Sequence, residues 1–210
     1  MKKSVEEMLL KFVLVNIGLM VAGIGNAFFF ASKLGTSPMA TIADGLHKTL
    51  GISHGTGMVI MNSIFLLVLL FTARKYIGIG TICVTVFLGI YVDIAGSFIA
   101  VFSIYENTMP VRLFFALLGS VLLGAGLGFY VVMEIGYGTL EALVQIIYKK
   151  LKCQYKFAKI IFDFTLTAVG YLLGGTIGIG TVVSVFLTGF IMQFSINYTK
   201  KILSKNRFFK

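Results

Sequence analysis

The sequence has few charged residues, two cysteines, two prolines and no tryptophan. Charged residues make up 12% of the 210 positions, whereas about 25% is usual in soluble domains. This scarcity argues strongly against an ordinary soluble protein. The two cysteines, Cys83 and Cys153, form no CxxC pair, so no disulfide framework is expected and both are read as structural thiols.

Several enzyme signatures are absent as well. The chain has no P-loop, no HExxH and no GxSxG motif, and no nucleophile–base constellation stands out. His47 and His54 are seven residues apart, but glycines interrupt the segment and no further ligand set is apparent. We therefore expect neither an enzyme nor a metal or cofactor site.

Most of the chain consists of long apolar runs. Hydrophobic residues make up 58% of the chain, and the mean hydropathy is +0.96. An apolar run of about 20 residues can cross a bilayer as a helix, which is the way a single segment satisfies its backbone in lipid. The sequence predicts an all-α, polytopic membrane helix bundle with about six spans, at residues 8–31, 57–73, 81–103, 111–133, 157–173 and 181–198.

The pentapeptide Ile-Gly-Ile-Gly-Thr occurs twice, at residues 77–81 and 177–181. At the same shift Gly89 corresponds to Gly189, and at a shift of 101 four glycines of the first half correspond to glycines of the second. The chain therefore reads as one unit written twice, at about residues 8–103 and 111–200, within a single membrane domain.

Each unit also holds a short element between its first two spans, at residues 38–50 and 139–150. Ser37 and Pro38 suit a helix start, as N-cap and first helical residue, and Gly138 takes the equivalent cap position. Both elements are too short and too polar to cross a membrane easily. They are either interfacial helices or re-entrant segments that line a cavity.

The basic residues predict the topology. With six spans and both termini in the cytoplasm, 15 of the 18 basic residues are cytoplasmic, and only Lys33, Lys48 and Arg112 lie outside. Such charges suit contact with anionic lipid headgroups, so the expected partner is the lipid bilayer of the cell membrane and not nucleic acid. An eight-span topology gives the same count, and span length favours six. Three spans in each half make the repeats inverted, whereas four would make them parallel.

Acids and amides inside the spans are the first candidates for a binding site. Asp93 lies near the middle of the third span and Asp163 lies within the fifth, where an ionisable group is costly and usually functional. Each equivalent pair holds one carboxylate and one amide. These pairs are Asp93/Gln193, Asn62/Asp163 and Asp44/Gln145. The acids could instead be protonated and hydrogen-bonded to the backbone of a neighbouring helix. The paired carboxylates and amides could instead reflect drift from a common ancestor, with no binding site.

The charges in the spans favour a cation, a proton, Na⁺ or the amino end of a zwitterion as the solute or coupling ion. The starts of the short elements, with Thr36 and Ser37, could instead present free N–H groups to an anion. Acids in the spans and free N–H groups at the starts of the short elements would together suit a zwitterion.

Several segments resemble the YczE/YyaS/YitT family of bacterial integral membrane proteins. The resemblance rests on Lys159-Ile160-Ile161-Phe162-Asp163, on the second Ile-Gly-Ile-Gly-Thr with Gly189, on Leu34-Gly35-Thr36-Ser37-Pro38 and on Gly89-Ile90-Tyr91-Val92-Asp93. It implies a small protein of the bacterial cytoplasmic membrane, and most members are described as permeases without an assigned substrate. Members often continue the Gly-Thr-Ser-Pro motif with a Trp and an acid, where this chain has Met39 and Ala40.

We therefore expect a small-solute secondary transporter, coupled to protons or Na⁺. Two alternatives stay open: a substrate-capture subunit that borrows an ATPase module, and a membrane scaffold or regulator that transports nothing. The sequence does not name the solute, and it leaves a homo-oligomer open.

Overall fold

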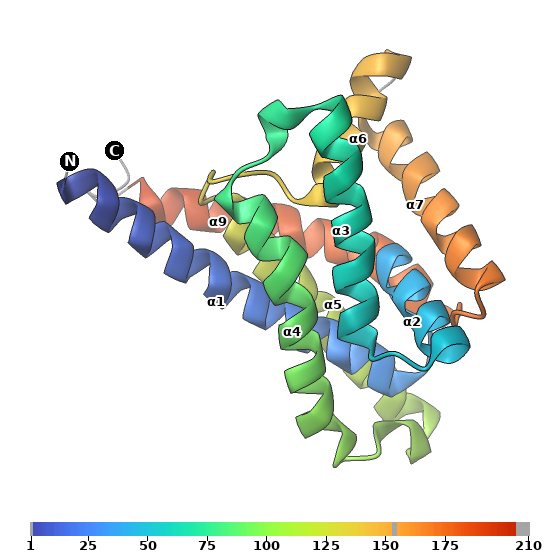
Figure 1. Ribbon diagram of the computed structural model, residues 1–210. Helices are drawn as coiled ribbons and strands as arrows, with labels where there is room; N and C mark the ends of the chain where they lie inside the picture. The colour runs from blue at the N-terminus through green and yellow to red at the C-terminus, as the bar shows by residue number, and fades with distance from the viewer. Residues whose placement is uncertain (1, 153–154, 205–210) are drawn as a thin grey trace.

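The computed structural model describes residues 2–152 and 155–204, and every regular element within these ranges is helical. Figure 1 shows the helices gathered into one bundle, so the predicted all-α helix bundle is confirmed. The helices are α1 (Lys2–Ser32), α2 (Pro38–Leu50), α3 (His54–Thr72), η1 (Arg74–Tyr76), α4 (Ile79–Ala100), η2 (Ile104–Glu106), α5 (Met109–Val131), α6 (Thr139–Leu151), α7 (Tyr155–Leu172), α8 (Ile179–Val183), η3 (Ser184–Thr188) and α9 (Gly189–Leu203).

Within the described ranges, five helices are long and apolar enough to cross a membrane: α1, α3, α4, α5 and the continuous helix from Ile179 to Leu203. The sixth expected span, α7, has 18 residues and includes Lys156, Lys159 and Asp163. It therefore differs from the other five in charge.

Most of the spans begin two or three residues before the expected position, and in α3 the added first turn is polar. Ser53 caps α3, and its hydroxyl accepts a hydrogen bond from the Thr56 N–H at 3.1 Å. The start of α3 therefore includes residues that apolarity alone leaves out. At the other end of the next span, α4 stops at Ala100 rather than 103, because Ser103 takes a left-handed conformation with φ of 42°.

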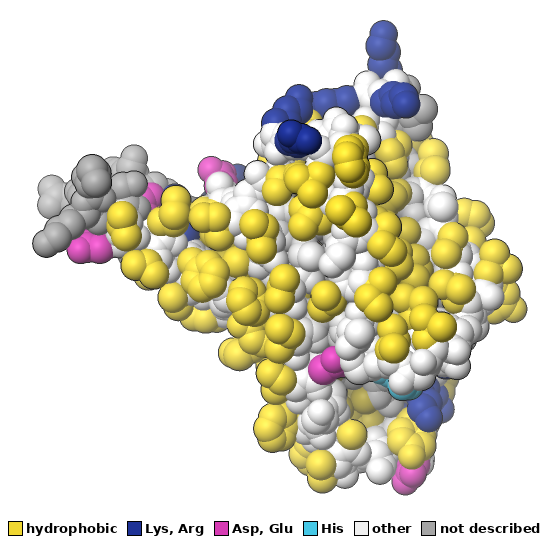
Figure 2. Space-filling view, viewed as in Figure 1, with side chains coloured by type: hydrophobic (Ala, Val, Ile, Leu, Met, Phe, Trp, Pro, Cys, Tyr) yellow, Lys and Arg dark blue, Asp and Glu magenta, His cyan; other side chains and the backbone are white. Residues whose placement is uncertain are grey.

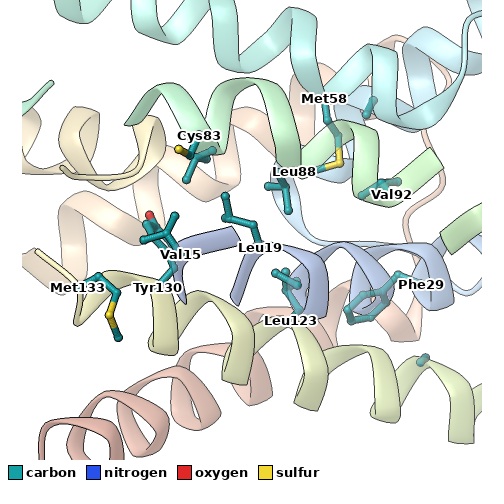
Figure 3. Packing of buried hydrophobic residues seen from close by; sticks show 14 of the residues in the cluster. Val15, Leu19, Phe29, Met58, Cys83, Leu88, Val92, Leu123, Tyr130 and Met133 are labelled. Atoms are coloured by element: carbon teal, nitrogen blue, oxygen red, sulfur yellow. The ribbon is translucent and has the colours of Figure 1, made fainter. Parts of the chain in front are cut away.

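The centre of the bundle is the crossing of α1 and α5. Gly25 of α1 lies against Gly119 of α5, and Gly18 lies against Gly126. Because the residue numbers rise along one helix as they fall along the other, the two helices run antiparallel. The buried side chains around this crossing, which include Leu19, Phe29, Leu123 and Tyr130, form the main core (Figure 3).

Each copy of the Ile-Gly-Ile-Gly-Thr motif packs against the loop before the short helix of the other half. Gly180 N–H donates to the Leu34 carbonyl at 2.8 Å, and Gly80 N–H donates to the Ile135 carbonyl at 2.9 Å. Gly35 has a φ of +102°, and a Cβ there would meet Thr181 Oγ1 at 2.5 Å. The repeated motif is thus a docking element between the two halves.

The short helices lie toward opposite ends of the bundle in Figure 1, with α2 at the lower right and α6 at the top. Helix α2 packs on α3 and α7, and α6 packs on the same two helices. Each short helix therefore contacts both α3, which belongs to the first half, and α7, which belongs to the second half.

Contacts of the last turns of α2 and α6 show which connections share an end of the bundle. Lys149 Nζ donates to the Tyr76 hydroxyl at 2.8 Å, and Figure 2 shows Lys and Arg side chains gathered at this end above a broad hydrophobic surface. Lys48 Nζ donates to Thr176 Oγ1 at 2.6 Å. The eight-span alternative puts the loops of Tyr76 and Lys149 on opposite sides of the membrane, so it disagrees with the first contact.

Candidate functional site

A cavity of about 150 Å³ lies where the first residues of α2 and α6 meet. Ser37 and Pro38 line it from one short helix, and Thr139 and Leu140 line it from the other. Neither helix start has a side-chain cap, because the Ser37 hydroxyl makes no capping bond and Gly138 has no side chain. The first N–H groups of a helix have no partner within the helix, so both starts present positive dipole ends and free donors to this region.

An ion pair faces the same cavity. Lys159 Nζ lies 2.7 Å from Asp163 Oδ1, one turn apart on α7, and both side chains line the cavity. The Asp163 side chain is 15% exposed, whereas that of Lys159 is 41% exposed. Glu141, in the first turn of α6, adds a second carboxylate, which folds back over Gly138. The cavity thus brings together one cation and two acids.

Buried polar atoms without a partner also line the cavity. Asn62 Oδ1 accepts a hydrogen bond from Thr139 Oγ1 at 2.5 Å, which leaves Nδ2 as a donor with no partner among the described residues. Asn26 is anchored by a bond from its Nδ2 to the Ala22 carbonyl, and its Oδ1 has no described partner. A buried polar group left unpaired costs about 1–3 kcal/mol, which a hydrogen bond from water or a solute in the cavity would offset.

Two hydroxyls on the last long helix add to this set. Ser184 and Thr188 line the cavity, and neither hydroxyl has a partner within the described part of the chain. They stand at the two ends of η3, a π-helical turn that interrupts the helix between α8 and α9. Such turns are rare and frequently occur at functional sites. The local irregularity here coincides with the cavity wall.

A larger hollow of about 530 Å³ adjoins the cavity, and Glu141 and Met192 line both. Its other lining residues include Glu134, Gln145 and Lys200. The central cavity therefore continues toward the part of the bundle that carries Lys200 in α9.

At the opposite end, Asp44 of α2 ties three segments together. Its carboxylate lies 2.9 Å from Lys48 Nζ and 3.2 Å from His54 Nε2, and it accepts the Thr176 N–H at 2.7 Å. Burial alone would raise the pKa of Asp44, but these bonds hold it well below its ordinary value of 3.8. A lowered pKa means that Asp44 stays ionised at neutral pH, and its contribution to stability is lost only in acid below that ordinary value.

Asp93 accepts hydrogen bonds from residues at the start of α3. Its Oδ1 accepts the Gly55 N–H at 2.8 Å, and its Oδ2 accepts the Ser53 hydroxyl at 2.5 Å. A hollow of about 450 Å³ lies beside it, lined by Ser53, His54 and Tyr105 among others. Asp93 is thus hydrogen-bonded to a helix N-terminus, away from the central cavity.

The structure divides the residues that the sequence proposed. Asn62, Asp163 and Ser37 gather at the central cavity, whereas Asp44 and Asp93 flank the start of α3. Two others lie apart from both groups. Gln193 is exposed and donates to Asn197 Oδ1 at 3.0 Å, and Thr36 is buried with its hydroxyl 3.1 Å from that of Thr41.

Several cavity residues were not among the candidates predicted from the sequence: Asn26, Glu141, Lys159, Ser184 and Thr188. Ser184 and Thr188 could have been found from the repeat, since they occupy the positions of Val84 and Leu88 and are one helical turn apart. Cys83 is buried in α4, and Cys153 lies outside the described residues. In the two described ranges, no group of three or more His, Cys, Asp or Glu side chains is placed to hold a metal ion.

Comparison with known proteins adds a family and its relatives. The profile of a family of unknown function, DUF6198, matches residues 9–197. YyaS of Bacillus subtilis is 29% identical over 201 residues, covering 94% of this chain and 98% of its own. YczE of the same organism, described as an uncharacterised membrane protein, is 26% identical and covers 95% of this chain and 91% of its own. A protein of Haemophilus influenzae is 26% identical and covers 88% of this chain and 82% of its own. No solved structure gives a significant match.

Proposed function

We propose that this chain, which belongs to the DUF6198 family of unknown function, is a secondary transporter that moves a small solute through the cavity between α2 and α6. The observation that carries the proposal is the meeting of two uncapped helix starts, an ion pair and unpartnered buried polar atoms at one cavity. Transporters commonly place their substrate where short or broken helices from two repeats present their N-termini.

The proposal includes an inverted repeat of the two halves, at about residues 8–103 and 111–200. Gly18 corresponds to Gly119 and Gly25 to Gly126, and the observed contacts are Gly18 with Gly126 and Gly25 with Gly119. Each glycine of α1 thus contacts the α5 residue that is equivalent to the other glycine. Such reciprocal contacts are expected when two equivalent surfaces are related by a two-fold axis. Antiparallel packing of the equivalent helices α1 and α5 supports opposite orientations of the two halves in the bilayer.

Access to the cavity differs at its two ends. On one side it adjoins the hollow that reaches Lys200, and on the other side Asp44, Lys48, His54 and Thr176 bind α2 to its neighbours. Since the basic residues favour cytoplasmic termini, we assign the hollow to the cytoplasmic side and the Asp44 contacts to the outside. In this assignment the conformation is open to the cytoplasm, and transport requires the Asp44 contacts to separate.

Uptake into liposomes tests the proposal. Purified protein is first screened by thermal shift against amino acids, amines, carboxylates and amides, and stabilising solutes are then offered to proteoliposomes under a pH or Na⁺ gradient. We expect accumulation that collapses when the gradient is dissipated. A solute that binds but never accumulates, or co-purification with an ATPase that is required for uptake, would contradict a secondary transporter.

A further inference from the structure

We propose that the cavity binds a small zwitterion of the amino-acid type with a short apolar side chain. This inference deepens the proposed function and rests on it, since it names the class of solute for the same site. It is carried by the difference between the two walls of the cavity, by the balance of charge around it and by its volume.

The two walls come from equivalent positions of the repeat and differ in polarity. Where the first half places Met58, Val84 and Leu88, the second half places Lys159, Ser184 and Thr188. All six residues line the cavity, so one wall is apolar and the facing set is polar. A solute that satisfies both walls has a polar head and a small apolar part.

The polar groups supply both donors and acceptors. Lys159 Nζ, the unpartnered Asn62 Nδ2 and the free N–H groups at the helix starts suit a carboxylate. Asp163, Glu141 and the unpartnered Asn26 Oδ1 suit an ammonium group. Asn26 and Asn62 are almost completely buried, so their unpaired atoms depend on hydrogen bonds from whatever occupies the cavity.

The charges around the cavity balance. Each helix N-terminus acts as roughly half a positive charge, so the two starts together offset about one carboxylate, and Lys159 offsets the other. A net anion or a net cation would leave an unbalanced charge in a place where charge is expensive. A zwitterion adds no net charge and can use the donors and the acceptors at once.

The volume limits the side chain. A cavity of about 150 Å³ holds roughly five water molecules at about 30 Å³ each. Alanine and similarly small amino acids fit such a space without displacement of the walls. Large aromatic or charged side chains would require rearrangement.

The test is binding to the detergent-purified chain, measured by calorimetry, with L-alanine and two analogues that each lack one charged group. Propionate lacks the ammonium and ethylamine lacks the carboxylate. We expect alanine to bind at least about tenfold more tightly than either, because each analogue leaves charged partners unsatisfied. Equal affinities for all three, or tighter binding of propionate or ethylamine, would overturn the proposal.

A paired substitution connects the binding to the polar wall. Ser184→Ala with Thr188→Val removes both hydroxyls with little change of volume, and we expect alanine to bind about tenfold more weakly while the melting temperature is retained or raised. Thr165→Val removes an exposed hydroxyl of α7 and serves as the matched control. Unchanged affinity in the double variant would remove these hydroxyls from the site and contradict the polar wall.

The binding and uptake experiments separate the two proposals. Alanine binding without any uptake would support the solute class and contradict the transporter. Gradient-driven uptake of a different solute, with no alanine binding, would overturn the solute class and leave the transporter standing.

Discussion

Asp163→Asn is expected to abolish coupled uptake while the protein still inserts and folds. Asparagine keeps the size and hydrogen-bonding capacity of the side chain, but it neither carries a charge nor exchanges a proton. Removal of one partner of a hydrogen-bonded charge pair costs about 2–5 kcal/mol, which corresponds to at least about 30-fold in initial rate. The measurement is initial uptake, and solute-induced proton flux, in proteoliposomes with matched amounts of protein.

Asp93→Asn is the informative comparison. Asp93 accepts hydrogen bonds from Ser53 and Gly55 at the start of α3, so its replacement should lower the melting temperature more than it lowers uptake per folded molecule. Wild-type coupled uptake in the Asp163 variant would exclude that carboxylate from the mechanism. Loss of uptake in the Asp93 variant alone would move the coupling site to the start of α3.

Gly25→Ala is expected to cause a large loss of stability. A Cβ at this position would meet the Leu123 backbone nitrogen at 2.5 Å and the Gly119 carbonyl oxygen at 2.7 Å. Because these are backbone atoms of the facing helix, α1 and α5 must separate along the main core. Overpacking of this kind costs about 1–3 kcal/mol, and we expect a clearly lower melting temperature in detergent together with reduced yield from the membrane.

Gly96→Ala is the matched control for this substitution. Gly96 lies inside α4, and a Cβ there has no neighbour within 4 Å among the described atoms. Since alanine favours helices over glycine by about 1 kcal/mol, this variant should be unchanged or more stable. Equal tolerance of both substitutions would show that α1 and α5 do not approach each other closely at Gly25 and Gly119.

The sequence predicts the helices well, because apolar run length and the repeat are local signals. The short helix at Pro38–Leu50 has the expected bounds, since Ser37 and Pro38 mark its start and Gly51 takes a left-handed conformation at its end. The span starts are less accurate, because polar first turns such as that of α3 do not contribute to an apolar run.

The site is less predictable, because it depends on which distant helices meet. Asp93 and Asp163 look alike as acids within apolar runs, yet one bonds a helix start and the other faces a cavity. Ser184 and Thr188 look like ordinary packing residues when their helix is read alone, and their place at the cavity follows from the packing of distant helices. Lys159 and Glu141 join the site through the packing of α6 and α7, which no local pattern encodes.

The central claim is that one cavity is reached from both sides of the membrane in turn. Ser37 lines the cavity and makes no capping bond, so Ser37→Cys, in a chain with Cys83→Ala and Cys153→Ser, is a suitable reporter. The measurement is its reaction with a membrane-impermeant thiol reagent, applied to intact cells and to inside-out vesicles. Alternating access predicts labelling from both faces, faster from the cytoplasmic face and slowed by bound solute. Labelling from one face under every condition, or from neither, would contradict the account.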